Sequence, residues 1–389
     1  MPPSSPAAGP LVGTLVLDLT RVLAGPFCTQ LLLDLGARVI KIERPDGGDD
    51  ARRIGPWLGG KSAYFMSLNR GKESLALDLS EPGGRALFER LLARADVLVE
   101  NFRPGVLERL GFGWEAVHAR HPRLVYASTS GFGQTGPWAA RPAYDLVVQA
   151  LGGVMSITGQ PGGAPTRVGS SVGDLHAGLF TALGIAAALA ERARSGRGAR
   201  IDVAMLDCQV AMLENAIARF AATGRVPGPL GSRHPSIAPF EAYPTADGHL
   251  VVAVGNDLLF GRLADALGCP ALAADPRFTD NARRTDHVDA LRDELSARLR
   301  AQPTAYWLER LERAGIPCAP IQDVAAVLEH PQVRARNMVV YVDDAEAGRV
   351  PMAGNPIKLA GVPDPPTRGS APDLDADRAR ILAWLDGEP

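Results

Sequence analysis

The sequence predicts an α/β protein with two domains, the larger of which is organised around a parallel β-sheet. An alternating β run at residues 14–19 is followed by helical periodicity at 27–35 and a second β run at 38–43. Two β runs joined by a helix form a crossover unit, which places both strands parallel in one sheet. With 389 residues, the chain also exceeds the usual size of a single core. We therefore expect a large Rossmann-like parallel-sheet domain and a smaller α+β domain.

Alternating β runs and helical segments continue along the chain, as a parallel sheet requires. Further β runs are expected at 74–79, 96–99, 124–130 and 200–205, with helices at 84–94, 146–151, 179–192 and 207–220. A Gly- and Pro-rich stretch at 223–239 is typical of an interdomain linker. Beyond it we expect two β runs in 241–254, helices near 258–267, 287–300 and 304–314, a β pair at 338–342 and 349–352, and a last helix at 377–385.

The composition argues against several classes of partner. A formal net charge of -2 offers neither a basic field for nucleic acid nor a polybasic anchor for a membrane. The longest apolar run, 179–190, is too short to span a bilayer, and the first residues lack the pattern of a signal peptide. No C-x-x-C pair suggests a zinc site or a disulfide framework among the four cysteines, Cys28, Cys208, Cys269 and Cys318. We expect a cytoplasmic protein without metal, nucleic-acid or membrane partners.

One stretch, residues 167–178, carries the most reactive arrangement in the chain. It places the carboxylate of Asp174 between Gly173 and Gly178 at the start of an apolar helix. Such an acid is either a helix cap, which accepts hydrogen bonds from free backbone N–H groups, or a reagent. The glycines leave room for a bulky substrate, so the carboxylate could act as a nucleophile. Backbone N–H groups around Gly169 and Gly173 are then candidate donors to an oxyanion.

Two further segments suit a phosphorylated ligand. A dinucleotide fold would carry G-x-G-x-x-G after the first strand and an acid after the second, but residues 22–26 read Val-Leu-Ala-Gly-Pro and the second β run ends at Arg44. This arginine could pair with a phosphate of coenzyme A, or it could be an ordinary surface residue. The block 100–109 follows the β run at 96–99, where open α/β sheets bind ligands. It supplies the candidate contacts Asn101, Phe102 and Arg109, although Phe102 taken alone is more typical of a core.

Several spaced blocks in one order are more specific than any single motif. They are Asp-Leu-Thr-Arg at 18–21, Ala-Gly-Pro at 24–26, Gly-Ala-Arg-Val-Ile-Lys-Ile-Glu-Arg-Pro at 36–45, Glu-Asn-Phe-Arg-Pro-Gly at 100–105, Arg-Pro-Ala-Tyr-Asp at 141–145 and Gly-Asp at 173–174. In these blocks the chain resembles the family III CoA transferases of the CaiB/BaiF type. That family includes formyl-CoA transferase, succinyl-CoA-dependent dicarboxylate transferases and alpha-methylacyl-CoA racemase.

The resemblance implies a chemistry and a set of site residues. In the transferases of this family, the aspartate that matches Asp174 is the covalent nucleophile, the substrates are an acyl-CoA and a carboxylic acid, and no cofactor is bound permanently. The resemblance also implies an interlocked homodimer and a large domain at 11–222, a linker with the small domain at 223–325, and a return to the large domain at 326–389. The CoA-binding positions that carry over are Leu23, Ala24, Arg44, Leu77, Asp78, Asn101, Phe102, Arg109, Arg141 and Tyr144.

We therefore predict a CoA transferase that moves CoA from a succinyl-CoA-like donor to a free dicarboxylate, through an aspartyl anhydride and an aspartyl thioester. The alternatives are a 2-methylacyl-CoA racemase and a CoA-binding module without catalysis, in which Asp174 is a cap. Racemisation needs a base on each face of the α-carbon. The racemase branch has a histidine where this chain has Tyr144, and a glutamate where it has Asp257. Tyrosine, with an unperturbed pKa of about 10, is a poor base at neutral pH, which disfavours the racemase.

Departures from the family pattern bear on the substrate. The long glycine-rich loop of formyl-CoA transferase is absent and residues 230–235 stand in that region, which makes oxalate a less expected substrate. Arg233 and His234 in this segment could bind the second carboxylate of a dicarboxylic acid, or could belong to a solvated loop. The family's C-terminal Leu-Gly-Glu-His-Thr block is replaced by Asp-Leu-Asp-Ala-Asp at 373–377.

Overall fold

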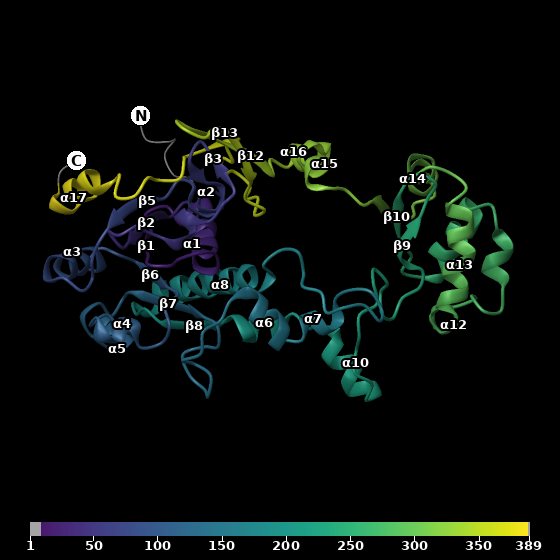
Figure 1. Cartoon of the computed structure of the whole chain (residues 1–389), viewed down its shortest axis with the longest axis horizontal. Helices are drawn as coiled ribbons and strands as arrows, with labels where there is room; N and C mark the ends of the chain where they lie inside the picture. Colours follow the sequence, from purple (N-terminus) through teal and green to yellow (C-terminus); the bar gives the residue numbers. More distant parts are fainter. Residues whose placement is uncertain (1–8, 388–389) are drawn as a thin grey trace. The chain divides into compact units, whose positions relative to one another are not determined.

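The computed structural model describes residues 9–387. By its internal contacts the chain divides into two compact units (Figure 1). The first unit comprises the chain up to Ser156, Arg167–Pro227 and the chain from Pro331 onward, and the second comprises Ile157–Thr166 and Gly228–His330. Sequence reasoning did not separate Ile157–Thr166 from the large domain, because this loop has no periodicity of its own.

The first unit is built on a six-stranded sheet in the order β5-β2-β1-β6-β7-β8, in which every neighbouring pair is parallel. The predicted α/β class with a large parallel sheet is confirmed. The chain winds from β1 toward β5 on one side and from β6 toward β8 on the other, so the order reverses between β1 and β6. Open α/β sheets bind ligands beyond the carboxyl ends of the strands at this switch point. The strands are β1 (Leu15–Asp18), β2 (Arg38–Glu43), β5 (Glu73–Ala76), β6 (Val97–Glu100), β7 (Val125–Ser130) and β8 (Arg200–Ala204).

Both faces of the sheet are buried under helices. Consecutive strand residues point to opposite faces, and both sets are apolar, as in other covered parallel sheets. Val16 and Val97 belong to the core formed with α1 and α8, whereas Leu17 and Leu98 belong to the core formed with α3, α5 and α17. These helices are α1 (Ala24–Asp34), α3 (Pro82–Leu92), α5 (Trp114–Arg120), α8 (Val172–Ser195) and α17 (Arg378–Asp386).

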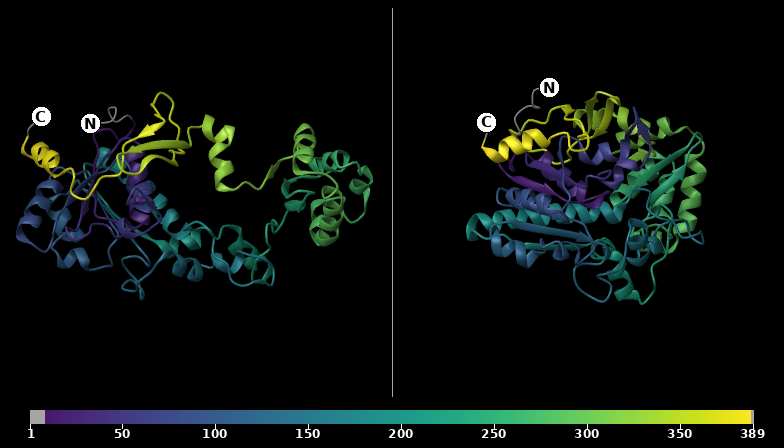
Figure 2. Two further views of the ribbon diagram at one scale, coloured as in Figure 1. Left: turned by 45° about the horizontal axis from the view of Figure 1, so that its top comes forward. Right: turned by 60° about the vertical axis from the view of Figure 1, so that its left-hand side comes forward.

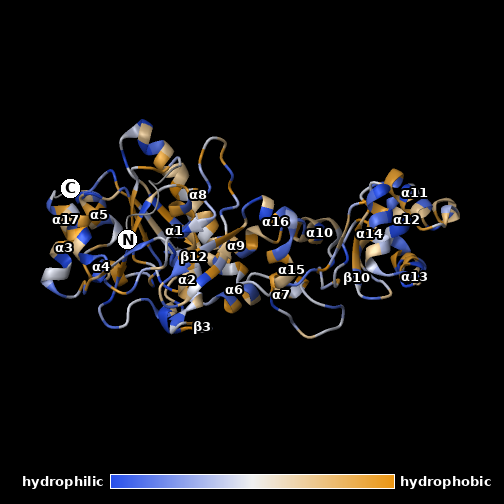
Figure 3. Ribbon diagram, turned by 90° about the horizontal axis from the view of Figure 1, so that it is seen from above, coloured by the Kyte–Doolittle hydropathy of each residue, from blue (hydrophilic) through white to orange (hydrophobic). Residues whose placement is uncertain are grey.

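Helix α8 is longer than the predicted helix at 179–192, and it begins before Asp174. Over an 18-residue window its mean hydropathy is 1.5, so among the described helices it alone is long and apolar enough to cross a membrane. Figure 3 shows hydrophobic colours along most of its length. The helix packs against α1, β7 and β8, and 39% of that window is buried in the protein. One side of α8 therefore belongs to the core, and the rest of the window is not buried within this chain.

The C-terminal segment covers the open edge of the large sheet at β5, where unpaired backbone groups would otherwise face solvent. The backbone N–H groups of Ser74 and Ala76 donate to the carboxylates of Asp377 and Asp375, each at 2.8 Å. In both views of Figure 2 this segment, in yellow, lies beside the N-terminal part of the chain. The acidic block that departs from the family pattern therefore has a structural role, because its aspartates accept hydrogen bonds from backbone N–H groups of the edge strand β5.

The remaining elements of the first unit surround this sheet, and a second sheet of order β13-β12-β14 lies near the C-terminus. Their bounds are η1 (Asp50–Arg53), β3 (Trp57–Leu58), β4 (Lys61–Ser62), α2 (Ala63–Asn69), α4 (Val106–Arg109), α6 (Asp145–Leu151), α9 (Met205–Ala211), α10 (Asn215–Thr223), α16 (Pro331–Ala335), β12 (Val339–Asp344), β13 (Gly348–Ala353) and β14 (Thr367–Arg368). A short helix, α7 (Val154–Ile157), ends where the second unit begins.

The second unit has its own core, in which helices pack on an antiparallel sheet of order β11-β10-β9. Tyr243 and Leu250 of the sheet are buried together with Phe260 and Leu295 of the helices. The elements are β9 (Phe240–Pro244), β10 (His249–Ala253), α11 (Asp257–Ala266), η2 (Pro270–Ala274), α12 (Asn281–Asp286), α13 (Val288–Leu299), α14 (Thr304–Arg313), β11 (Cys318–Pro320) and α15 (Val324–Glu329). The smaller α+β unit expected from the sequence is therefore present.

Candidate active site

Asp174 lies in the first turn of α8 and is mostly shielded from solvent. Within residues 9–387, no hydrogen bond or ion pair engages its carboxylate, and the cap position of the helix is Ser171. Asp174 is therefore not a helix cap. Burial, and then the negative charge of Asp145, raises the pKa of Asp174 to about 7. A carboxylate that is neither paired nor hydrogen-bonded remains available for chemistry.

Asp145 fixes the start of α8. Its Oδ1 accepts a hydrogen bond from the backbone N–H of Gly173 at 2.8 Å, and its Oδ2 accepts one from Nε2 of Gln149 at 2.7 Å. Oε1 of Gln149 in turn accepts from the backbone N–H of Val168 at 2.9 Å. These bonds tie the loop before α8 to α6 and hold Asp174 in place.

The glycines around Asp174 serve packing more than substrate access. A Cβ on Gly173 would lie 2.7 Å from Val148 Cγ2, so glycine is needed for α8 to approach α6. Because the Gly173 N–H already donates to Asp145, the expectation that it serves an oxyanion is wrong. Gly169 lies in an exposed loop, where a Cβ would meet no other atom within 4 Å. Gly178 brings α8 against the start of α1, since a Cβ there would lie 2.5 Å from the carbonyl oxygen of Ala24.

A pocket forms at the switch point of the sheet, between the loops that follow β1, β6 and β7, and Asp174 lines it. Most of the residues predicted from the sequence meet there. They are Leu23, Ala24, Asn101, Phe102, Arg141, Tyr144 and Asp174. Lining residues that sequence reasoning missed include Arg21, Asp50, Arg103, Thr129, Ser130 and Met205. Thr129 and Ser130 end β7 and Met205 follows β8, so their positions at strand ends were the available signal.

Four predicted CoA contacts do not line this pocket. Arg44 pairs with Asp50 at 2.5 Å, and Asp50 is itself a lining residue. Leu77 is buried, whereas the exposed Asp78 accepts hydrogen bonds from the backbone and hydroxyl of Ser80. Arg109 is exposed in α4. Their assignment to CoA remains a prediction.

Two arginines at the pocket have cationic groups that no described carboxylate neutralises. Arg141 lies over the ring of Trp138, 4.2 Å from its centre, and Arg103 is exposed. Neither forms an ion pair within the described chain, whereas Arg21 pairs with Asp50 at 3.3 Å. Free guanidinium groups suit phosphate. Tyr144 is 75% exposed and faces the same pocket.

The position that matches the racemase glutamate, Asp257, belongs to the second unit. Its Oδ1 accepts a hydrogen bond from Nη2 of Arg284 at 2.6 Å, and Arg284 is fully buried. The carboxylate of Asp257 is therefore engaged in an ion pair. Nearby in sequence, His234 accepts a hydrogen bond from the backbone N–H of Ser236 through Nδ1 at 3.1 Å.

Comparison with known proteins now identifies the family, since the family model described as CoA-transferase family III matches residues 11–378. The chain belongs to CoA-transferase family III. This confirms the resemblance inferred from the sequence blocks, and the family III chain is an enzyme of the CoA-transferase type.

The names of similar proteins also indicate a CoA-transferase. The family III chain is 50% identical over 374 residues to an acetyl-CoA:oxalate CoA-transferase of Acetobacter aceti, covering 96% of this chain and 95% of the relative. It is 41% identical over 384 residues to a succinate–glutarate CoA-transferase of Agrobacterium fabrum, covering 97% and 96%. A solved structure of a CAIB/BAIF family protein from Brucella suis matches with a TM-score of 0.86 and 39% identity, covering 97% of this chain and 100% of that one.

Proposed function

We propose that this enzyme transfers CoA from an acyl-CoA of the succinyl or acetyl kind to a free dicarboxylate, with Asp174 as the covalent nucleophile. The observation that carries the proposal is the unpaired, shielded carboxylate of Asp174 in a pocket at the switch point of the sheet. The names of two relatives support the substrate class, because oxalate and glutarate are both dicarboxylates.

The proposed chemistry begins when an oxygen of Asp174 attacks the donor thioester carbon. The carbonyl electron pair moves onto oxygen, and collapse of this oxyanion expels the CoA thiolate and leaves an acyl-aspartyl anhydride. The thiolate then attacks the aspartyl carbonyl, which releases the donor acid and forms an aspartyl-CoA thioester. An acceptor carboxylate displaces the thiolate to give a new anhydride. Attack of the thiolate on the acceptor carbonyl forms the new acyl-CoA and restores Asp174.

The environment of Asp174 suits this role. Its pKa of about 7 leaves the carboxylate partly ionised at neutral pH and makes it more basic than an ordinary aspartate. An ion pair would stabilise the carboxylate and make attack less favourable. Arg103 and Arg141, the free cations at the pocket, are the groups that we assign to phosphates of the substrate.

The acceptor is the least defined substrate. The absent glycine-rich loop argued against oxalate, yet a relative at 50% identity is named for oxalate. The loop therefore does not exclude oxalate, which belongs in any acceptor panel beside succinate and glutarate.

A matrix of donors and acceptors tests the proposal. Acetyl-CoA and succinyl-CoA are each incubated with oxalate, succinate, glutarate or a monocarboxylate, and products are scored by mass. We expect a new dicarboxylyl-CoA in at least one combination. A parallel incubation of a 2-methylacyl-CoA in deuterium oxide reports on racemisation. Rapid deuterium uptake at the α-carbon without any acyl transfer would contradict the proposal.

We also propose that the enzyme is a cytoplasmic homodimer. Exposed apolar side chains on α6, α8 and α9, which pack against one another, support a further chain as their cover: Leu146, Leu151, Leu179, Leu183 and Val210. The four cysteines, all free in the structure, suit a reducing compartment. Light scattering on the purified protein tests the dimer, and a monomeric mass at micromolar concentration would contradict it.

A further inference from the structure

The turn between β1 and α1 holds an unusual backbone conformation. Val22 has a φ of 69°, in the left-handed region that β-branched residues rarely adopt. Strain of this kind persists only where surrounding contacts enforce it, and it gathers at functional sites. Val22 and its neighbours Arg21 and Leu23 all line the pocket that contains Asp174.

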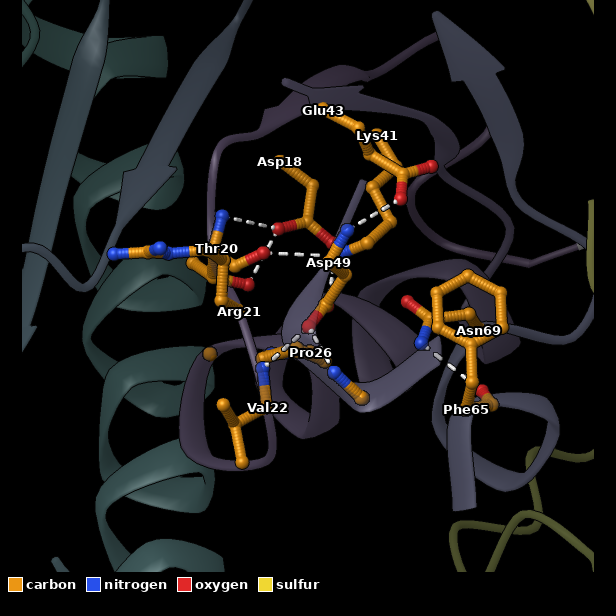
Figure 4. A network of polar contacts seen from close by, with 12 residues as sticks. Asp18, Thr20, Arg21, Val22, Pro26, Lys41, Glu43, Asp49, Phe65 and Asn69 are labelled. Carbon is orange, nitrogen blue, oxygen red and sulfur yellow. Dashed lines mark hydrogen bonds and ion pairs between the residues drawn. The ribbon is translucent and has the colours of Figure 1, made fainter. Parts of the chain in front are cut away.

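Two side chains enforce this turn from different parts of the chain. The side-chain amide of Asn101 binds the backbone of Arg21 on both sides. Its Oδ1 accepts from the Arg21 N–H at 2.9 Å, and its Nδ2 donates to the Arg21 carbonyl at 2.8 Å. Asp49 accepts the N–H of Val22 at 3.0 Å through Oδ1. Figure 4 shows Asp49 beside Val22 within this network.

Asp49 is itself fixed by buried charge. Its side chain is fully shielded and pairs with Nζ of Lys41 at 2.9 Å, and its backbone N–H donates to Glu43 at 2.9 Å. Lys41 also donates to the carbonyl of Thr20 at 2.8 Å. The turn is therefore anchored at three consecutive residues, Thr20, Arg21 and Val22, by the side chains of Lys41, Asn101 and Asp49.

The anchored turn leaves donors free at the start of α1. Within the described chain, the backbone N–H groups of Leu23 and Ala24 donate to no acceptor, whereas that of Phe27 donates to the Leu23 carbonyl at 2.8 Å. Leu23 and Ala24 line the pocket together with Asp174. Gly178, one turn beyond Asp174 on α8, packs against Ala24. Asp174 and the free N–H groups of Leu23 and Ala24 therefore belong to residues that line the same pocket.

We propose that Asp49 and Asn101 are positioning residues: they hold the strained turn at Val22 so that the N–H groups of Leu23 and Ala24 face the reacting carbon at Asp174. These groups replace Gly173, whose N–H is occupied, as donors to the oxyanion. The proposal rests on the function proposed above, because it assumes covalent chemistry at Asp174. Donors fixed in advance stabilise the tetrahedral oxyanion more than the planar thioester, so their effect falls on kcat.

The test combines loss and rescue. Asp49→Asn keeps an acceptor for the Val22 N–H but removes the charge that pairs with Lys41. We expect kcat to fall by roughly ten- to a hundredfold, with KM for the acyl-CoA changed by less than about threefold. Val22→Gly added to Asp49→Asn should recover most of the loss, because glycine adopts positive φ without strain. A merely structural role for Asp49 predicts no such rescue.

One control variant and one alternative variant complete the test. Asp34→Asn breaks a different buried ion pair, which Asp34 of α1 forms with Arg70 at 2.7 Å, and should leave kcat unchanged. If Asp49→Asn does not fold, Asn101→Asp tests the same turn with the buried pair intact, and Val22→Gly should rescue it too. An unchanged kcat, a loss that Val22→Gly does not relieve, or an equal loss in Asp34→Asn would overturn the proposal. In those cases an inactive Asp174→Asn would show that the proposed function still stands.

Discussion

Asp18 and Asp49 on the one hand and Asp174 on the other are all shielded from solvent, but they differ in their partners. Asp18 and Asp49 lie fully buried beneath the start of α1 and pair with Lys72 and Lys41, each at 2.9 Å. Asp174 lies shielded at the start of α8 and pairs with nothing in the described chain. Burial alone therefore does not decide what a carboxylate does. Its partners do.

The pKa values follow the partners. Burial alone would raise the pKa of Asp18, but Lys41, Lys72 and the hydroxyls of Thr20 and Thr29 hold it well below its usual range. Asp174 has no such partners, so burial and Asp145 raise its pKa to about 7. One carboxylate is fixed in its ionised form and serves the structure. The other can gain and lose a proton near neutral pH and is suited to chemistry.

Asp174→Asn should have the largest effect on activity. Removing a covalent nucleophile while keeping its shape is expected to lower kcat by on the order of 10⁴-fold. The protein should still bind CoA, measured by titration calorimetry. Asp207→Asn, at an exposed carboxylate in the first turn of α9, is the matched control and should retain activity. Comparable rates in Asp174→Asn and wild type would contradict the role of Asp174.

Lys72→Met should have the largest effect on stability. Nζ of Lys72 contacts Asp18, Thr29, Asn69 and the carbonyl of Pro26, so its loss leaves the buried carboxylate of Asp18 without its ion-pair partner. We expect the free energy of unfolding in urea to fall by about 3–5 kcal/mol. Arg194→Met, at an exposed pair with Glu191, should change it by less than about 0.5 kcal/mol. Equal effects of the two variants would show that the buried pair adds nothing.

Asp145→Asn should shift the pH dependence. For wild type, kcat/KM is expected to rise with pH through about 7, because the nucleophile must be ionised. Removing the charge of Asp145 should move this limb to lower pH. The limb should not reach that of an ordinary aspartate, since burial is the larger cause and remains. If the limb stays in place, the pH dependence of kcat/KM does not report the ionisation of Asp174.

The smallest predicted effect is a gain in stability of Asp174→Asn at pH 8. Between about pH 4 and 7 the folded state holds a proton on Asp174 that the unfolded state has lost, so stability falls as pH rises through this window. Asparagine removes that loss. We expect a gain on the order of 1 kcal/mol at pH 8, reduced by solvent screening, and none at pH 4. A gain of equal size at both pH values would argue against the raised pKa.

Sequence reasoning located the parts of the site that follow strand ends. Asn101 comes directly after β6, and the carboxyl ends of parallel strands meet at one edge of the sheet, whereas Leu23, in the loop after β1, was predicted from the family resemblance. Arg44 and Leu77 also follow strands, β2 and β5, but these lie on the outer side of β1, away from the switch point. Strand order, which the sequence did not reveal, separates the two pairs.

The contacts that occupy backbone N–H groups could not be predicted from the sequence. Gly173 appeared free because its acceptor, Asp145, is 28 residues away in the chain. Lys41 and Asp49 gave no signal either, since charged residues near strand ends are usually solvated. Only packing in three dimensions places them under the turn at Val22.

Covalent trapping at Asp174 tests the central claim most directly. Wild-type enzyme is incubated with acyl-CoA and then hydroxylamine, and the peptide that contains residue 174 is analysed by mass spectrometry. An anhydride or thioester at Asp174 predicts a hydroxamate on that residue, formed only when acyl-CoA is present and absent in Asp174→Asn. A fully active enzyme that yields no adduct at Asp174, or one that carries the adduct on another residue, would contradict the account.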